Sequence, residues 1–392
     1  MKTRLMMTAA ALLAAAPAGA AVPALTVDLD PATLTVGGIA YGALFAPDLP
    51  KATGGADQRW ATGAADVNLK LSRDYDSGLS LSLKSSFEVL RDRLSYDNYG
   101  GALVQKVYGV AQTGLGTVEV GMTDGAVYAL AITGPVSDDI TSIENPNATF
   151  FIDPSTGRAF GQLFDFSSAT NSSLNYAKIS YYTPRILGFE LGASYTPAQN
   201  REVIPFLNNG PHKENRQKSI WEVALSYSEQ WETMALGVYG GVALAHGDGK
   251  LAEDASLTDW SVGSEFDYTI NDDWKWAIGG GYRRANTFAF DIYDARTSGA
   301  TESGHLSSTL SYGDYSLTGE YGRGTADGGM AGPVIGIKAW QVQLGYTIDT
   351  NWQLTTGWQE HVYDRNLGSF YDGSKRLAMS AAFVHLKFKV GG

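Results

Sequence analysis

The sequence predicts an all-β fold, a transmembrane antiparallel β-barrel of 16 strands, and three observations predict it. Hydrophobic residues alternate with small or polar residues in runs of about ten positions, the length of a strand that crosses a membrane. Short connections rich in Gly, Asn, Asp and Pro alternate along the chain with longer ones. Aromatic residues repeatedly follow the short connections. In lipid every backbone polar group must be paired, so strands with one apolar face must close into a barrel.

Composition excludes several other classes of protein. The 392 residues carry 29 Lys and Arg against 41 Asp and Glu, for a net charge of −12. An acidic chain without a basic tract is a poor nucleic-acid ligand, because phosphate neutralisation needs clustered cations. The absence of cysteine excludes disulfide scaffolds and cysteine-ligated metals. After the N-terminus there is no apolar stretch of about 18 residues, which excludes a helical membrane protein.

The first 20 residues have the pattern of a secretory signal peptide. Lys2 and Arg4 precede an apolar, Ala-rich run that is too short to span a membrane, and Ala18-Gly19-Ala20 supplies small residues for cleavage. Removal of residues 1–20 would leave 372 residues and a net charge of −14. We expect residues 21–392 to form a single exported barrel domain.

The strands follow from the alternation, and their number follows from the connections. The clearest alternating runs are 67–72, 79–89, 221–227, 260–270 and 340–348. Seven short turns are expected at 76–78, 114–116, 184–188, 228–230, 271–273, 313–314 and 349–351. Eight longer loops are expected near 46–62, 91–102, 123–171, 197–218, 246–258, 286–303, 324–336 and 364–375. Fifteen connections join sixteen strands, and an even-numbered barrel with short periplasmic turns and longer external loops is the outer-membrane design.

Four of the short turns are followed at once by an aromatic residue: Trp231, Trp274, Tyr315 and Trp352. An aromatic at the first position of successive strands lies at one height on the barrel, so these residues predict an aromatic girdle at the membrane interface.

A barrel of this size is expected to be hollow. About eight strands close on packed side chains, whereas sixteen to eighteen leave an aqueous channel. The inward Ser, Thr, Gly, Gln and charged positions can be hydrated there, and strand signals begin soon after residue 20, without a plug domain before them.

Two segments of this chain resemble the Gram-negative general porin family. The residues that carry the resemblance are Gly109, 114–121, 171–176, 182–184, 188–189 and 192–195. Across about 30–390 the likeness lies in the overall arrangement of strands and loops. It implies an outer-membrane channel for passive diffusion of small hydrophilic solutes, a homotrimer set in outer-membrane lipid and lipopolysaccharide, and a third loop, here about 123–171, that folds inward and narrows the pore.

The resemblance also implies a pore constriction in which an acidic loop faces a basic wall. The loop carries six carboxylates: Asp124, Asp138, Asp139, Glu144, Asp153 and Asp165. For the wall, pairing of Tyr75 with Leu79 around a turn makes Lys70 and Lys84 direct cross-strand partners on the polar face. Either these lysines form the wall, with Arg73 as a further candidate, or they are solvated lumen lysines without a special role. Lys106 and Arg283 are weaker candidates, and the ambiguous phase of the 103–113 strand leaves the direction of Lys106 open.

The remaining chemistry-bearing residues predict no catalytic or metal site and no cofactor. The five histidines lack metal-ligand spacing and are interpreted as surface or loop residues. Gly279, Gly280 and Gly281 are interpreted as adaptation of the backbone to strand tilt and curvature.

The function expected from the sequence is therefore that of a general diffusion porin with mild cation preference, since lumen charge sets selectivity. The alternatives are a substrate-specific channel for a sugar or another nutrient, and an outer-membrane enzyme. The first would need lumen aromatics and the second a catalytic constellation, and the sequence shows neither.

Overall fold

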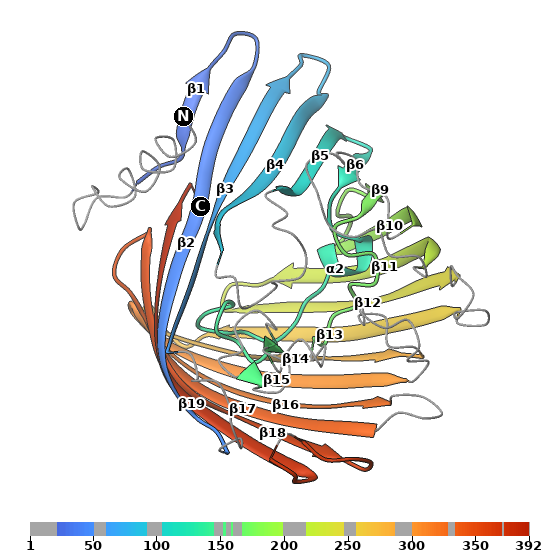
Figure 1. The fold of residues 1–392 in the computed structure, drawn as a ribbon. Coiled ribbons are helices and arrows are strands. Elements are labelled where there is room, and N and C mark those ends of the chain that lie inside the picture. Colours follow the sequence, from blue (N-terminus) through green and yellow to red (C-terminus); the bar gives the residue numbers. More distant parts are fainter. Residues whose placement is uncertain are drawn as a thin grey trace, which may run out of the picture.

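The computed structural model describes residues 22–50, 60–91, 104–144, 152–153, 158–159, 167–198, 217–246, 256–286, 300–327, 334–370 and 372–391. Sixteen antiparallel strands form a ring that closes where β19 pairs with β2 (Figure 1). The strands of the ring are β2 (Thr33–Asp48), β3 (Ala61–Asp74), β4 (Ser80–Arg91), β5 (Val104–Thr113), β6 (Gly116–Met122), β9 (Ala177–Tyr182), β10 (Phe189–Ala198), β11 (Lys218–Gln230), β12 (Met234–His246), β13 (Leu257–Thr269), β14 (Trp274–Ala285), β15 (Thr301–Tyr312), β16 (Tyr315–Asp327), β17 (Val334–Thr347), β18 (Trp352–Arg365) and β19 (Arg376–Val390).

The predicted closed, sixteen-stranded antiparallel barrel is confirmed. Consecutive strands of the ring are neighbours throughout, with short connections after β3, β5, β9, β11, β13, β15 and β17 and mostly longer ones after the alternate strands. The connection after β16, expected as a loop near 324–336, covers only 328–333 and is as short as the one after β9. A further strand, β1 (Leu25–Asp28), pairs with the first residues of β2 beyond the end of β19. The longest connection lies between β6 and β9 and contains the helix α2 (Ala126–Ala129) and the short strands β7 (Ile152–Asp153) and β8 (Arg158–Ala159).

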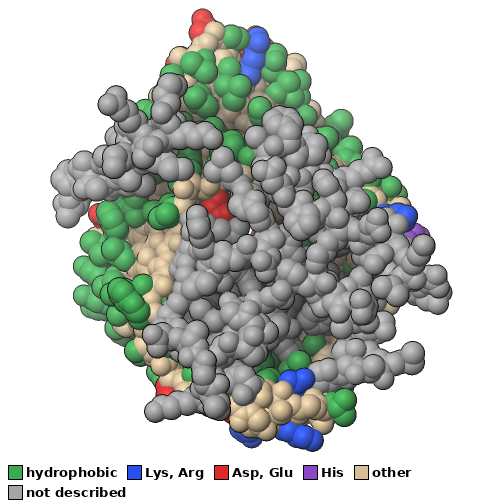
Figure 2. All heavy atoms as spheres, in the orientation of Figure 1, with side chains coloured by type: hydrophobic (Ala, Val, Ile, Leu, Met, Phe, Trp, Pro, Cys, Tyr) green, Lys and Arg blue, Asp and Glu red, His purple; other side chains and the backbone are tan. Residues whose placement is uncertain are grey.

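Alternation along each strand separates an apolar outer face from an inner face that contacts the rest of the chain. On β11, Trp221, Val223 and Leu225 are about half exposed, whereas Glu222 and Ala224 between them are buried. Hydrophobic side chains accordingly cover the flank of the molecule (Figure 2). Such an apolar exterior over so many strands is stable only against an apolar medium. Among the described residues no helix has the length and apolar character needed to cross a membrane.

Aromatic residues pair across neighbouring strands at the rim of the short turns. Trp274 lies against Tyr312, Tyr315 against Tyr346, and Trp352 against Phe388, with ring centroids 4.8, 4.8 and 4.4 Å apart. Trp231 lies in the turn after β11, where its N–H donates to the carbonyl of Met234, and its side chain is 46% exposed. The structure therefore places all four residues of the predicted girdle at one rim.

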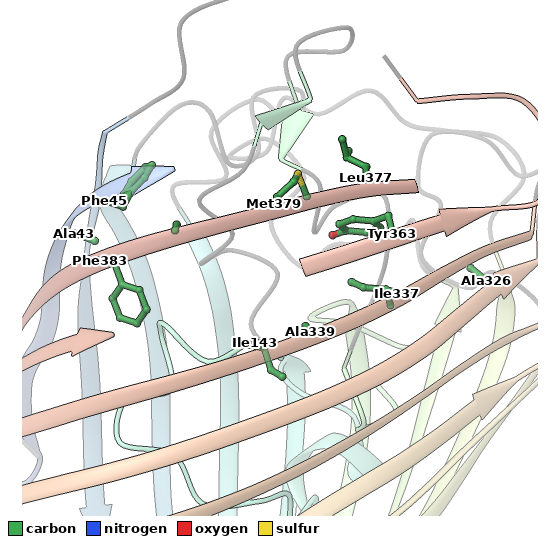
Figure 3. Close-up of a cluster of buried hydrophobic side chains, with 11 residues drawn as sticks. Ala43, Phe45, Ile143, Ala326, Ile337, Ala339, Tyr363, Leu377, Met379 and Phe383 are labelled. Atoms are coloured by element: carbon green, nitrogen blue, oxygen red, sulfur yellow. The ribbon is translucent and has the colours of Figure 1, made fainter. Parts of the chain in front are cut away.

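The inner face is not polar throughout, which differs from the expectation of a polar lumen. Inward residues of β2, β16, β17, β18 and β19 form a buried apolar cluster together with Ile143 of the β6–β9 connection (Figure 3). Tyr363, Leu377, Met379 and Phe383 are each 2% exposed or less. Apolar side chains are stable on an inner wall where another segment covers them, and this part of the wall is covered.

Candidate functional site: the inner segment and the lumen wall

Residues 123–144 and 167–176, called here the inner segment, run from β6 and back to β9 and lie inside the ring of strands (Figure 1). Its two arms meet at one carboxylate, Glu222 of β11, which is 1% exposed. The N–H of Val127, in α2, donates to Oε2 of Glu222 at 3.3 Å, and the N–H of Ser173 donates to Oε1 at 3.2 Å. A carboxylate at the start of a helix satisfies N–H groups that have no partner within the helix.

A second carboxylate of the wall, Glu320 of β16, holds the middle of the inner segment. The hydroxyl of Ser142 donates to its Oε2 at 2.7 Å and the N–H of Ile143 at 3.3 Å. His305 of β15 lies between two carboxylates, with Nε2 3.3 Å from Glu320 and Nδ1 3.3 Å from Glu144 of the inner segment. Glu144 therefore contacts a buried imidazole and does not face an open lumen.

A third contact joins the inner segment to β19, the last strand of the ring. Lys387 donates to Asp138 and to Asp139, each at 3.0 Å, and Nδ1 of His385 contacts the other oxygen of Asp138. Burial alone would raise the pKa of Asp138, but the hydrogen bond from His385 and the charges of His385 and Lys387 outweigh it, so the pKa lies well below the ordinary carboxyl value. Asp138 is therefore a buried anion, whereas the Asp139 side chain is 74% exposed.

The returning arm is held by Asp259 of β13. The hydroxyls of Thr170 and Ser172 donate to its two oxygens at 2.9 and 2.6 Å, and Arg283 of β14 donates to the same carboxylate at 2.8 to 3.2 Å. Asp259 and the Arg283 side chain are almost fully buried, so the charges are paired and also hydrogen-bonded. Arg283 thus stabilises an anchor of the inner segment.

Glycines of the wall allow the backbone of the inner segment to approach closely. A Cβ atom on Gly134 of the inner segment would lie 2.0 Å from Ser307 Oγ and 2.7 Å from the carbonyl oxygen of Gly279. A Cβ on Gly263 would lie 2.2 Å from the carbonyl oxygen of Ile132. The interpretation of Gly279 as an adaptation to curvature is therefore incomplete, because its backbone is a contact surface for the inner segment.

The side of the lumen formed by β5 and β9 carries two more lysines. Lys106 donates to Asp124 at 2.6 Å, which resolves the phase of β5 and turns Lys106 inward. Lys178, 4% exposed, donates to the carbonyl oxygens of Thr123 and Leu174.

The predicted register of the two candidate wall lysines is found. Lys70 and Lys84 are direct partners across β3 and β4, and Lys84 lies 5.7 Å from the ring centre of Tyr108. Arg73 faces the other way, because it is paired with the outward Leu81 and stacks over Tyr75 at 4.6 Å.

The structure pairs the loop acids with Lys106, a weaker candidate for the wall, and with three cations outside the predicted wall, His305, His385 and Lys387. Within the described ranges, the ion-pair partners of the inner segment's carboxylates are Lys106, His305, His385 and Lys387, and Lys70, Lys84 and Arg73 are not among them. Asp153 lies in β7, and its side chain is outside the described part of the structure, as is Asp165.

The interpretation of the histidines as surface or loop residues is wrong for three of the five. His305, His361 and His385 occupy inward positions and are 5%, 2% and 1% exposed. They alternate with lipid-facing residues such as Leu306 and Leu386, and this alternation was the available signal. No group of three or more potential metal ligands occurs among the described residues.

Comparison with known proteins decides the family. The model of the Gram-negative porin family matches residues 8–389, nearly the whole chain. The chain belongs to the Gram-negative porin family. It is therefore an outer-membrane diffusion channel and not an enzyme. No curated protein is similar enough to count as a relative.

Solved porin structures share the fold at low sequence identity. OmpF of Salmonella typhi in complex with daunomycin matches with a TM-score of 0.59 and 12% identity, over 93% of this chain and 100% of that chain. The anion-selective porin of Comamonas acidovorans matches with a TM-score of 0.55 and 11% identity, over 91% and 99%. The trimer form of OmpT from Vibrio cholerae matches with a TM-score of 0.52 and 14% identity, over 91% and 99%. At such identities the likeness shows the fold alone.

Proposed function

We propose that this porin gives passive, size-limited passage to small hydrophilic solutes and ions, and that the inner segment sets the limit. The observation that supports the proposal is the fixed position of that segment. Three carboxylates of the wall, Glu222, Asp259 and Glu320, and the cation Lys387 hold it against β11–β19. The solute path then lies between the inner segment and the wall of β2–β5.

Selectivity follows from the charges left accessible along that path. Asp138 and Glu144 contact Lys387, His385 and His305, so they contribute little net field to the lumen. Asp139 is exposed on one side, and Lys70 is exposed on the other. With a net charge of −14 after loss of residues 1–20, a mild cation preference is the expected balance.

The assembly and orientation of the porin are part of this proposal. The short turns would face the periplasm and the longer connections the exterior, as in the outer-membrane design. Residues 1–20 would be the removed signal peptide; they lie outside the described residues. A homotrimer of three separate pores is supported by the family and by the trimer form of OmpT, which has the same fold.

Two measurements on the purified full chain test its ion selectivity and whether it passes solutes without a specific binding step. In a salt gradient across a planar bilayer, the reversal potential should have the sign of mild cation preference. In a vesicle-swelling assay, rates for uncharged sugars should fall smoothly with solute size and rise linearly with concentration. A clear anion preference would overturn the charge argument, and saturable flux of one sugar would favour the substrate-specific channel instead.

A further inference from the structure

Two inward carboxylates of β13 lie in the lumen without a partner. Glu265 and Asp267 share the phase of Ser261, which is fully buried, whereas Val262 and Tyr268 in the other phase are 46% and 39% exposed. Both acids are partly exposed, and among the described residues neither has a hydrogen bond or an ion pair. They differ in this from the three wall carboxylates that hold the inner segment.

The inner segment passes the wall beside these acids. A Cβ on Gly263, two residues from Glu265, would lie 2.2 Å from the carbonyl oxygen of Ile132. A Cβ on Gly279, the direct partner of Glu265 on β14, would lie 3.1 Å from Cα of Gly134. Glu265 therefore lies at the margin of the inner segment, and the second acid lies two residues closer to the short turn.

The neighbours of the two acids leave their carboxylates open to the lumen. Glu265 is paired with glycine on both adjacent strands, and Asp267 is paired with alanine on both. Arg283 of the same wall is buried and bound to Asp259. Lys275, diagonal to Asp267 at the rim, is exposed and forms no ion pair among the described residues. The wall of β12–β14 thus carries accessible negative charge on the short-turn side of the inner segment.

The lysine pair of β3 and β4 lies across the lumen from these acids. In the ring of sixteen strands β3 and β4 are the second and third and β13 is the tenth, so they are seven or eight strands apart. Lys70 and Lys84 are each five residues from the N–H···O contact that closes their turn. Glu265 and Asp267 are five and three residues from Ile270, where their turn closes. Opposite charges therefore face each other in the half of the lumen next to the short turns.

The lysines, like the acids, are not paired. Lys70 and Lys84 are direct cross-strand partners, and among the described residues neither forms an ion pair. The inward carboxylates of their own strands, Asp66 and Asp74 on β3 and Glu88 on β4, are each four residues from the lysine of that strand, about 13 Å along it. At this level each wall therefore keeps its own sign of charge.

We propose that Glu265 and Asp267 are the residues that draw cations into the lumen, and that Lys70 and Lys84 oppose them. Charges that line an aqueous path concentrate counter-ions and exclude co-ions over about a Debye length, about 10 Å at 0.1 M salt. The carboxylates of the inner segment contribute less, because they are paired with wall cations. The assignment rests on the diffusion function proposed above and names the residues behind its cation preference.

Reversal potentials in a salt gradient across a planar bilayer test the assignment on the full-length porin. The double variant E265Q/D267N should have a cation-to-anion permeability ratio at least about twofold below that of the unmodified porin. K70Q/K84Q should shift the ratio by a similar factor in the opposite direction. The variant Asp267→Asn alone keeps the test available if the double variant does not fold.

The matched control removes two carboxylates that do not face the lumen. Glu302 of β15 accepts from the exposed, outward Tyr282. Glu360 of β18 is the direct partner of the outward Trp340. E302Q/E360Q therefore changes the net charge of the porin as much as the first double variant does, and it should leave the permeability ratio unchanged.

The salt dependence separates a role of charge from a role in packing. The Debye length falls to about 3 Å at 1 M salt, so the charges of the wall then act over a shorter range. The difference in permeability ratio between E265Q/D267N and the unmodified porin should therefore be largest near about 0.1 M salt and smaller near about 1 M. Single-channel conductance at the higher concentration should be nearly the same in both.

Three results would overturn the assignment. The first is an equal permeability ratio in E265Q/D267N and in the unmodified porin, and the second is an equal shift in E302Q/E360Q, which would mean that net charge alone decides. The third is a shift that does not diminish at high salt, which would indicate an altered pore shape. Absence of conductance from the unmodified porin would contradict the diffusion function itself, so the two failures are distinguishable.

Discussion

At the scale of single residues, the porin uses buried carboxylates of the wall as acceptors for backbone N–H groups of the inner segment. Glu222 is the clearest case, because it accepts from Val127 and Ser173 on the two arms of the segment. A buried N–H that loses its acceptor costs about 1–3 kcal/mol. The strength of these contacts therefore decides whether the inner segment stays on the wall.

Substitution of Glu222 should release both arms of the segment at once. We expect Glu222→Ala to lower the free energy of unfolding by about 2–4 kcal/mol, from two buried donors left without acceptors. Glu222→Gln should recover part of this loss, because its carbonyl oxygen still accepts. Thermal unfolding in detergent measures both, with Glu229→Ala on the outward face of the same strand as the control. Equal losses in Glu222→Ala and Glu229→Ala would contradict the anchor.

The Asp138 contact to His385 and Lys387 should make stability depend on pH in acid. Because the pKa of Asp138 is lowered in the folded porin, its contribution is fully present above its unfolded value, near 3.9, and is lost as pH falls from there toward the lower folded value. The stability difference between the unmodified porin and Asp138→Asn should therefore be constant above about pH 5 and shrink below pH 4. Unfolding temperatures measured against pH check this.

The neighbouring carboxylate provides the control for this titration. Asp139→Asn should show almost no difference at any pH, because an exposed ion pair contributes at most about 1 kcal/mol. A difference for Asp138→Asn that grows as the pH falls would have the opposite sign and would refute the assignment.

At the scale of elements, the inner segment and the glycine-bearing strands β13 and β14 fit together through close backbone contacts. A methyl group on Gly134 would overlap Ser307 Oγ and the backbone of Gly279. We expect Gly134→Ala to displace this part of the segment and to change single-channel conductance and its noise. Gly319→Ala, where a Cβ would meet nothing within 4 Å, is the control. Conductance and noise unchanged in Gly134→Ala would show that this contact does not position the segment.

Sequence patterns predict the strands well and the contacts of the inner segment poorly. Alternation and turn composition are local, so the number of strands and even the pairing of Lys70 with Lys84 follow from the sequence. Glu222, Asp259 and Glu320 occupy ordinary inward positions, and no local feature distinguishes an anchor from a hydrated lumen residue. The side of the barrel to which Lys106 points could not be predicted. The pairing of β5 with β4 shifts register between Ser86 and Phe87, and a shift of one residue reverses which residues face inward.

At the scale of the whole molecule, the porin is a closed sheet that carries its own constricting segment on one side of the lumen. The apolar exterior requires lipid, and the closed ring leaves no unpaired edge. Most of the polar network and the covered apolar cluster lie on the β11–β19 side or next to it, at β2, whereas Lys106 of β5 and Lys178 of β9 hold the two ends of the inner segment. We propose that this asymmetry leaves the solute path on the side of β2–β5.

Single-channel conductance of the folded, detergent-purified porin in a planar bilayer measures whether this path is open and whether the inner segment sets its width. We expect large ohmic steps that close in thirds for a trimer, and a changed step size when Glu222 is replaced by Ala. Absence of conductance from porin shown to be folded would mean that the inner segment closes the lumen, and it would contradict an open diffusion channel.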